Sequence, residues 1–192
     1  MPPSRQIPLF GADRALPEGL RYREEFISPD EERALATDIA ALPLKPFEFH
    51  GFLGKRRVIS FGWKYVFDGS GLRETDPIPD FLLPLRARAA EFAGVEDTAL
   101  MHVLLTEYEA GAGIGWHRDR PDFGEVVGIS LLSPVQLRFR RKAGQRWERQ
   151  VLTAQPRSAY LLTGPSRTDW EHGISAVDAL RYSITFRTLR QR

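Results

Sequence analysis

The sequence of 192 residues has no cysteine, only four histidines and only four lysines. The absence of cysteine excludes disulfide scaffolds, thiol nucleophiles and thiolate metal sites, so any metal site must use histidine and carboxylate ligands. No apolar run approaches the ~18 residues that a membrane-spanning helix needs, and the first residues lead into no apolar signal segment. The sequence therefore predicts no membrane association and a cytoplasmic location.

The remaining composition is that of a folded domain. Hydrophobic residues make up 42% of the chain and charged residues 27%, which is neither a disordered nor a membrane composition. A chain of this length forms one structural domain with a sizeable core, and we expect a monomer. Only four of the 27 Lys and Arg residues are lysines, and the fork-shaped guanidinium of arginine suits phosphate and carboxylate. A GC-rich codon usage explains the arginine excess equally well.

The N-terminal half combines two helices with an aromatic ribbon. Residues 1–25 have no periodicity and are predicted to form an arm or an extended entry. Ser28-Pro29-Asp30-Glu31 predicts the start of a helix, because Ser28 and Glu31 can form a capping box around a proline in the first turn. A second helix is expected after residue 80, closed by Gly94. Between the helices, residues 47–67 alternate aromatic, basic and glycine residues and predict two or three strands.

The C-terminal half is predicted to consist of short strands separated by Gly, Pro and Asp. Many short strands after two helices indicate an α+β, mainly β fold: a jelly roll, sandwich or barrel that carries its helices on one side. The expected strands span residues 100–108, 114–119, 126–132, 135–140, 147–153, 158–163, 172–175 and 180–188.

Three residues of this half have the chemistry of a metal site. In an extended strand His117 and Asp119 point to the same face. With His172 as a second imidazole, they form the two-histidine, one-carboxylate set of non-heme Fe(II) oxygenases, which leaves three coordination positions open. The His-x-Asp pair alone is weak evidence, and a structural role for His117 is an equal alternative at this point.

The last predicted strand carries arginine on one face. Arg181, Ser183, Thr185 and Arg187 share one side of it, and the intervening residues are apolar or aromatic. An arginine that faces a barrel interior is costly unless an anion neutralises it, so this strip fits a small dicarboxylate. The alternative is an edge strand whose arginines face solvent.

Five motifs follow one another in this half. They are Glu107-Tyr108-x-x-Gly111, His117-x-Asp119, Pro156-Arg157-Ser158 with Leu162-Thr163-Gly164, Ser166-Arg167 with Trp170-x-His172-Gly173-Ile174, and Arg181-x-Ser183-x-Thr185-Phe186-Arg187. With these motifs, residues 100–190 resemble the AlkB-like Fe(II)/2-oxoglutarate-dependent dioxygenases. The resemblance implies a double-stranded β-helix (jelly roll) core over residues 96–192, with residues 1–95 as arm, helices and a nucleotide-recognition lid packed on it.

The resemblance also implies a site. His117, Asp119 and His172 would bind Fe(II), and Arg181 would bind the distal carboxylate of the cosubstrate 2-oxoglutarate with the help of Tyr108. Arg187 would lie near the proximal carboxylate or the iron-side acid. O2 would be the second cosubstrate and ascorbate the reductant in vitro. Thr106 and Ser183 stand where DNA-repair members of the family often carry asparagine, so cosubstrate contacts there are fewer or bridged by water.

The family implies a nucleic-acid substrate. The first expectation is oxidative demethylation of 1-methyladenine and 3-methylcytosine in DNA or RNA, which is alkylation damage repair. One alternative is a hydroxylase or demethylase of modified tRNA nucleosides or of a protein side chain, and another is a catalytically silent nucleic-acid-binding module. The candidate substrate residues, each of which has a core or surface role as its alternative, are Trp63, Tyr65, Phe67, Trp116 and Arg118.

Overall fold

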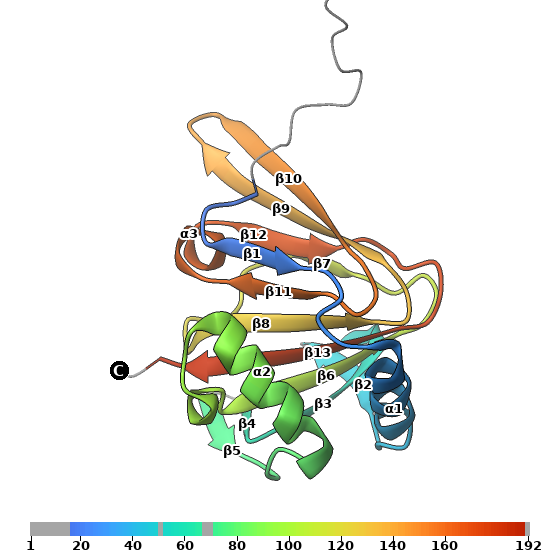
Figure 1. The fold of residues 1–192 in the computed structure, drawn as a ribbon. Coiled ribbons are helices and arrows are strands. Elements are labelled where there is room, and N and C mark those ends of the chain that lie inside the picture. The colour runs from blue at the N-terminus through green and yellow to red at the C-terminus, as the bar shows by residue number, and fades with distance from the viewer. Residues whose placement is uncertain (1–15, 50–51, 67–70, 191–192) are drawn as a thin grey trace, which may run out of the picture.

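In the computed structural model, which describes residues 16–49, 52–66 and 71–190, two antiparallel sheets face each other (Figure 1). The described chain places seven strands in the large sheet, in the order β1 (Leu20–Arg23), β11 (Ala159–Leu162), β8 (Phe123–Leu131), β13 (Arg181–Leu189), β6 (His102–Tyr108), β3 (Phe52–Phe61) and β2 (Lys45–Phe49). The small sheet has the order β10 (Arg146–Ala154), β9 (Val135–Ala143), β12 (Glu171–Ile174) and β7 (Ile114–His117). A separate hairpin pairs β4 (Trp63–Val66) with β5 (Gly71–Glu74).

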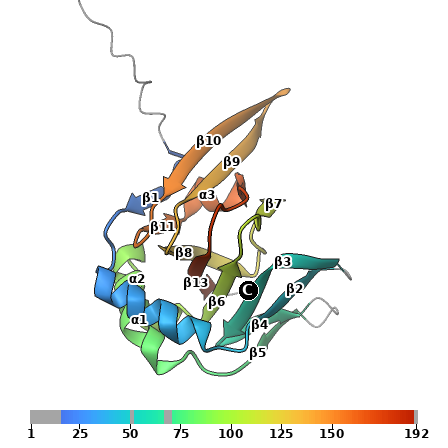
Figure 2. The same cartoon turned by 90° about the vertical axis from the view of Figure 1, so that its right-hand side faces the viewer.

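The helices cover one face of the large sheet. Figure 2 shows α1 (Pro29–Ala40) and α2 (Leu83–Ala93) on one side of this sheet, and β7, β9 and β10 on the other. The helices and the sheet share a continuous apolar core, to which α1 contributes Leu35 and Ile39 and α2 contributes Leu85 and Ala89. The helices therefore cover one face of the large sheet, and the opposite face of this sheet is the one that can form a binding site.

A second apolar cluster lies between the two sheets. The side chains of β13 alternate between the helix-covered core and the space between the sheets. Ile184 and Phe186 of β13 belong to the helical core. Ser183 and Thr185 alternate with them and line a cavity between the sheets. The polar strip of this strand therefore faces the molecular interior, which excludes the solvent-facing alternative.

The predicted local structure is largely confirmed. Helix α1 begins with the expected capping box between Ser28 and Glu31. Helix α2 ends at Gly94, whose φ of 74° is the left-handed conformation that glycine adopts without strain. All eight strands expected after residue 100 are present, and the two facing sheets confirm the jelly roll.

Three elements differ from the prediction. Residues 20–23, expected as part of an arm, form β1 and pair with β11 at the edge of the large sheet. A short helix, α3 (Gly164–Thr168), follows β11. Strand β7 ends at His117, so Asp119 lies in the following loop and not on the same strand.

In the described ranges, helices are too short or too polar to cross a bilayer.

Candidate functional site

A cavity of about 700 Å³ lies between the two sheets. The small sheet contributes His117 and His172, the loop after β7 contributes Asp119, and the large sheet contributes polar side chains from β6 and β13. The lid-side strands β2 and β3 close one side with Phe47 and Arg56. Most of the predicted site residues therefore meet in one place.

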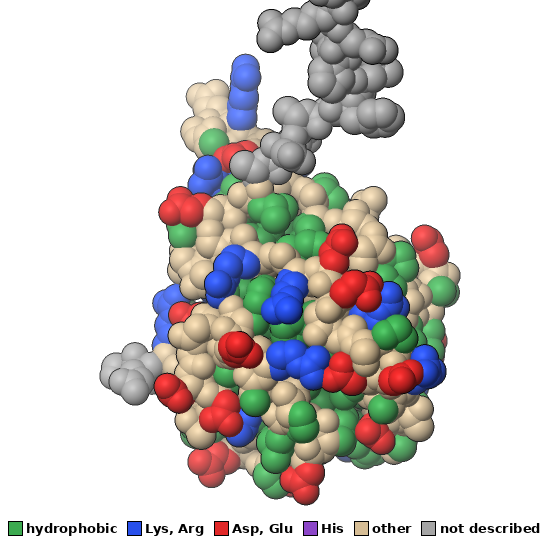
Figure 3. Space-filling view, in the orientation of Figure 1, with side chains coloured by type: hydrophobic (Ala, Val, Ile, Leu, Met, Phe, Trp, Pro, Cys, Tyr) green, Lys and Arg blue, Asp and Glu red, His purple; other side chains and the backbone are tan. Residues whose placement is uncertain are grey.

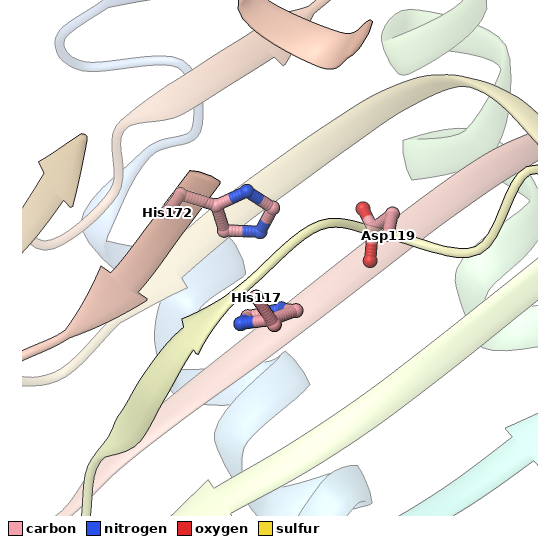
Figure 4. A group of neighbouring side chains, drawn as sticks. All are labelled: His117, Asp119 and His172. Atoms are coloured by element: carbon pink, nitrogen blue, oxygen red, sulfur yellow. The ribbon is translucent and has the colours of Figure 1, made fainter. Parts of the chain in front are cut away.

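His117, Asp119 and His172 converge in this cavity. Their ligand atoms all lie within 4.8 Å of one another. His117 on β7 and His172 on β12 are direct cross-strand partners, and their ring centroids are 4.3 Å apart. Figure 4 shows the two rings at neighbouring strand positions and Asp119 on the loop after β7. Two imidazoles and one carboxylate are the donor set that Fe(II) accepts.

The orientation of His117 suits a metal ligand. Its Nδ1 lies 3.0 Å from the carbonyl oxygen of Gly115. Because a carbonyl only accepts hydrogen bonds, Nδ1 donates, and the lone pair of the ring remains on Nε2. Burial lowers the pKa of His172 to about 4, so this imidazole is neutral at physiological pH and has a lone pair to offer.

Asp119 is held ionised by its neighbours. Burial raises the pKa of its carboxyl, but Arg187, with smaller contributions from His172, His117 and Arg167, outweighs this effect and holds the pKa far below its usual range. Arg187 Nη2 donates to Asp119 Oδ1 over 3.2 Å, so Arg187 contacts the acid of the triad. The Nε of Arg187 has no partner within the described residues.

Arg167 fixes the loop that carries Asp119. Its buried guanidinium donates to the carbonyls of Asp119 at 3.3 Å, Arg120 at 2.6 Å, Phe123 at 2.7 Å and Gly124 at 2.9 Å. The loop has no ladder partner of its own along residues 118–120, so these bonds replace the sheet contacts that a strand would have. Arg167 thus positions Asp119 although the carboxylate is not in a strand.

Arg181 is fully buried at 0% exposure and is incompletely satisfied. Its Nε donates to Ser130 Oγ at 3.1 Å, and its guanidinium carbon lies 4.9 Å from the ring centroid of Tyr108. Among the described residues, neither Nη1 nor Nη2 has a hydrogen-bond partner. Buried guanidinium nitrogens without partners are costly, and two neighbouring Nη atoms match the two oxygens of a carboxylate. The residues present therefore fit a carboxylate-bearing cosubstrate.

Thr106 and Ser183 are cross-strand partners on β6 and β13, and both line the cavity. Tyr160 on β11 lines the same wall, although the sequence did not single it out. Its ring lies across Gly128 of β8: a Cβ at Gly128 would sit 2.1 Å from Tyr160 Cζ. Burial raises the pKa of Tyr160 to about 12, with Arg181 opposing, so its hydroxyl stays a hydrogen-bond donor.

The predicted substrate residues that the structure describes lie on β4 of the predicted lid, on β7 and on the loop that follows β7 (residues 118–122, the metal loop). Trp116 and Arg118 line the cavity. The guanidinium of Arg120 stacks on the ring of Tyr65, with 3.4 Å between the guanidinium carbon and the ring centroid. This contact joins the lid to the metal loop. Trp63 lines a separate shallow groove beside Met101. Phe67 lies outside the described residues.

A model of the 2OG-Fe(II) oxygenase superfamily matches residues 64–187, more than half of the chain. The chain belongs to the 2OG-Fe(II) oxygenase superfamily. The mouse (Mus musculus) tRNA (carboxymethyluridine(34)-5-O)-methyltransferase ALKBH8 is 29% identical over 168 residues, which are 84% of this chain and 25% of the mouse protein. The alkylated DNA repair protein ALKBH8 homolog of Arabidopsis thaliana is 25% identical over 214 residues, 96% of this chain and 59% of the plant protein. This superfamily member thus spans about a quarter of its mouse relative.

Two solved structures share the fold. OsALKBH1 superposes with a TM-score of 0.67 at 14% identity, covering 91% of this chain and 100% of that chain. A prolyl-4-hydroxylase from Pseudomonas putida reaches 0.62 at 15% identity, covering 91% and 94%. The predicted AlkB-like assignment is confirmed by the family match and these relatives.

Proposed function

We propose that the protein is an Fe(II)- and 2-oxoglutarate-dependent dioxygenase that oxidises a C–H bond of a modified base in a nucleic acid. The observation that carries this proposal is the pairing of the His117, Asp119 and His172 cluster with a buried Arg181 whose Nη atoms have no partner among the described residues. A metal-type donor set lines the cavity, and a carboxylate-type anchor lies beside Tyr108 of its wall; a chelated oxo-acid with a distal carboxylate requires both.

When bound, Fe(II) with 2-oxoglutarate and O2 supplies the oxidising power that breaks an unactivated C–H bond. The protein's own residues do the rest. His117, Asp119 and His172 hold the metal, and Arg187 orients the Asp119 carboxylate through their 3.2 Å contact. Arg181 would bind the distal carboxylate of the cosubstrate, with the hydroxyls of Thr106 and Tyr108 on β6 and of Ser183 on β13 as polar neighbours.

The first substrate candidate is an N-methylated base, 1-methyladenine or 3-methylcytosine, in DNA or RNA. Oxidation of the methyl group yields an unstable hemiaminal, which releases formaldehyde and restores the base. The name of the plant relative, an alkylated DNA repair protein homolog, supports this candidate.

The second candidate is a modified nucleoside of tRNA. The name of the mouse relative, a tRNA carboxymethyluridine methyltransferase, favours it. Trp116 and Arg118 at the cavity suit either candidate, because aromatic rings stack on extruded bases and arginine binds the neighbouring phosphate.

The experiment that tests the proposal is mass spectrometry of a mixed substrate panel. The protein is incubated with Fe(II), 2-oxoglutarate, O2 and ascorbate, and is offered methylated single-stranded DNA, duplex DNA, RNA and bulk tRNA. We expect 2-oxoglutarate-dependent succinate together with one oxidised or demethylated nucleoside. Folded His117→Ala and Asp119→Ala variants should form neither product. Equal turnover by either variant contradicts the proposal.

A further inference from the structure

The described lining of the cavity carries more positive than negative charge. Arg56, Arg118, Arg120 and Arg187 line it, and Asp119 is the one carboxylate among the described lining residues. From this arrangement, and resting on the proposed function, we infer that the substrate base is neutral or anionic and that a cationic base is disfavoured. The following contacts show which of these charges are free to act on a substrate.

Asp119 is already engaged. Arg187 donates to it, and both imidazoles of the triad surround it. Glu107 precedes Tyr108 on β6, but its side chain lies on the face of this strand opposite to the cavity. There its carboxylate accepts hydrogen bonds from Arg57 at 2.7 Å and 2.9 Å. Asp122 on the metal loop accepts from Arg120 at 3.2 Å. These three acids are therefore each paired with one of the protein's own arginines.

Arg56 is a cation of the interior that has no acid partner among the described residues. It is half-buried on β3, stacked on Phe47 of β2 with 3.9 Å between its guanidinium carbon and the ring centroid. Within the described chain, no acid pairs with it. Arg56 is also the cross-strand partner of Tyr108, which in turn is the partner of Arg181. It therefore lies on the lid side of Tyr108, away from Arg181, and its charge is not needed to anchor the cosubstrate.

Arg118 and Arg120 lie on the metal loop on either side of Asp119. Arg118 is exposed and donates to the backbone carbonyl of Asp169 at 3.2 Å. Arg120 lies over Tyr65 of the lid and is partly exposed. Solvent-accessible arginines on both sides of an opening suit the phosphates that flank an extruded nucleotide. In this arrangement Arg118 and the partly exposed Arg120 would meet the phosphates, and Arg56 would meet the base.

The charge of the base then decides between the two substrate candidates. Methylation of adenine N1 or cytosine N3 leaves the base cationic at neutral pH, whereas methylated or carboxylated uracils are neutral or anionic. Like charges repel more strongly in a partly desolvated cavity than in water. A cationic base would need a free carboxylate beside it, and the described lining offers none. The inference thus favours uridine-type substrates.

The test uses two bases of nearly the same shape and different charge. Short single-stranded RNAs of one sequence carry either 3-methyluridine, which is neutral, or 3-methylcytidine, which is cationic. Binding to protein loaded with Mn(II) and 2-oxoglutarate is measured by fluorescence anisotropy, so the readout does not depend on turnover. We expect the neutral base to bind about tenfold more tightly, equivalent to ~1.4 kcal/mol.

Two variants assign the preference to Arg56. Arg56→Gln should bring the ratio of the two affinities toward one, because the repelling charge is gone. Lys55→Gln is the matched control: Lys55 is the preceding residue on β3, is exposed and is absent from the cavity lining, so its ratio should equal that of the wild type.

Equal binding of the two RNAs, tighter binding of 3-methylcytidine or no binding of either overturns the inference. A preference that survives in Arg56→Gln overturns the role of this residue. Failure of the proposed function has a different signature: no RNA or DNA of the panel then supports succinate formation with Fe(II), whatever the order of binding.

Discussion

Arg167 and Arg181 are both buried arginines, at 6% and 0% exposure, but the protein satisfies them in opposite ways. Arg167 donates to four backbone carbonyls of residues 119–124 and so completes a loop. Arg181 has one protein acceptor, Ser130, and within the described residues its two Nη atoms have none. Burial alone thus does not identify a ligand-binding arginine; the unfilled donors do.

The arginines of the β9–β10 hairpin give the third case. Arg141 pairs with Glu148 at 2.7 Å, and Arg140 pairs with Glu171 at 2.6 Å. Both are partly exposed, and such pairs contribute little to stability. In Figure 3, on the face that carries α2, cations and acids are likewise interspersed. The cavity differs from these surfaces because two of its lining arginines, Arg56 and Arg118, have no acid partner among the described residues.

The largest effect is expected from Arg181→Met. Loss of two charged hydrogen bonds should weaken 2-oxoglutarate binding by about 100-fold or more. The ligand-free protein should be as stable as the wild type or more stable, because an unpaired buried charge is replaced by an apolar side chain. Calorimetric titration into Mn(II)-loaded protein and urea unfolding measure the two quantities.

Pyruvate is the control ligand for this variant, since it has the oxo-acid group but no distal carboxylate. It should bind wild type and Arg181→Met equally. If Arg181→Met binds 2-oxoglutarate as tightly as the wild type, or loses as much affinity for pyruvate, then Arg181 is not the arginine that binds the distal carboxylate.

Arg167→Met should have the opposite profile. It leaves four backbone carbonyls, one of them in a fully buried bond, without this donor, so the free energy of unfolding should fall by about 3 kcal/mol. Arg141→Met on the hairpin should change it by less than about 0.5 kcal/mol. Urea unfolding monitored by tryptophan fluorescence checks both values. If Arg167→Met has the same free energy of unfolding as the wild type, the hydrogen bonds of Arg167 do not stabilise the loop.

A smaller effect is expected beside Arg181, at the contact between Gly128 and Tyr160. Gly128→Ala places a Cβ 2.1 Å from Tyr160 Cζ and should cost about 1–3 kcal/mol through overpacking. Tyr160→Val in the same chain should recover most of that loss, which a double-mutant cycle measures. Additive losses would mean that the two side chains do not compete for space.

The smallest effect concerns a surface arginine that is fully paired, Arg88. The ion pair with Arg88 and the Ser28 backbone N–H lower the pKa of Glu31 from its usual 4.5 to about 2. A lowered carboxyl pKa stabilises the fold above pH 4.5, and this contribution disappears as the pH falls toward 2. Because the Glu31 side chain is 40% exposed, Glu31→Gln should cost less than about 1 kcal/mol at pH 7. The difference from wild type should vanish near pH 2, as urea unfolding at both pH values will show.

Elements with a local signal were predictable from the sequence. The capping box of α1, the Gly94 end of α2 and the alternation along β13 all depend on neighbours within a few residues. The same alternation predicted that Arg181 and Arg187 share one face, and the family resemblance, not the alternation, implied that this face is the interior. His117 and His172 required the family motifs, because their cross-strand pairing joins segments 55 residues apart in the printed sequence.

The remaining features depend on contacts between distant segments. Asp119 was expected on the strand of His117, but the strand ends and Arg167 holds the loop instead. Arg56 lies at the cavity because the register of β3 with β6 pairs it with Tyr108. No local sequence pattern specifies this register. Strand β1 pairs with a partner some 140 residues later in the chain, so its short sequence was indistinguishable from an arm.

The close approach of Gly128 and Tyr160 has a consequence for how this chain can change. The ring of Tyr160 occupies the space that a side chain at position 128 would need. Amino-acid substitutions at these two positions are therefore coupled during evolution. A descendant that acquires a larger residue at 128 must first, or at once, accept a smaller one at 160. Paired substitution at these two positions, without change at the metal-type residues, is the expected trace in related sequences.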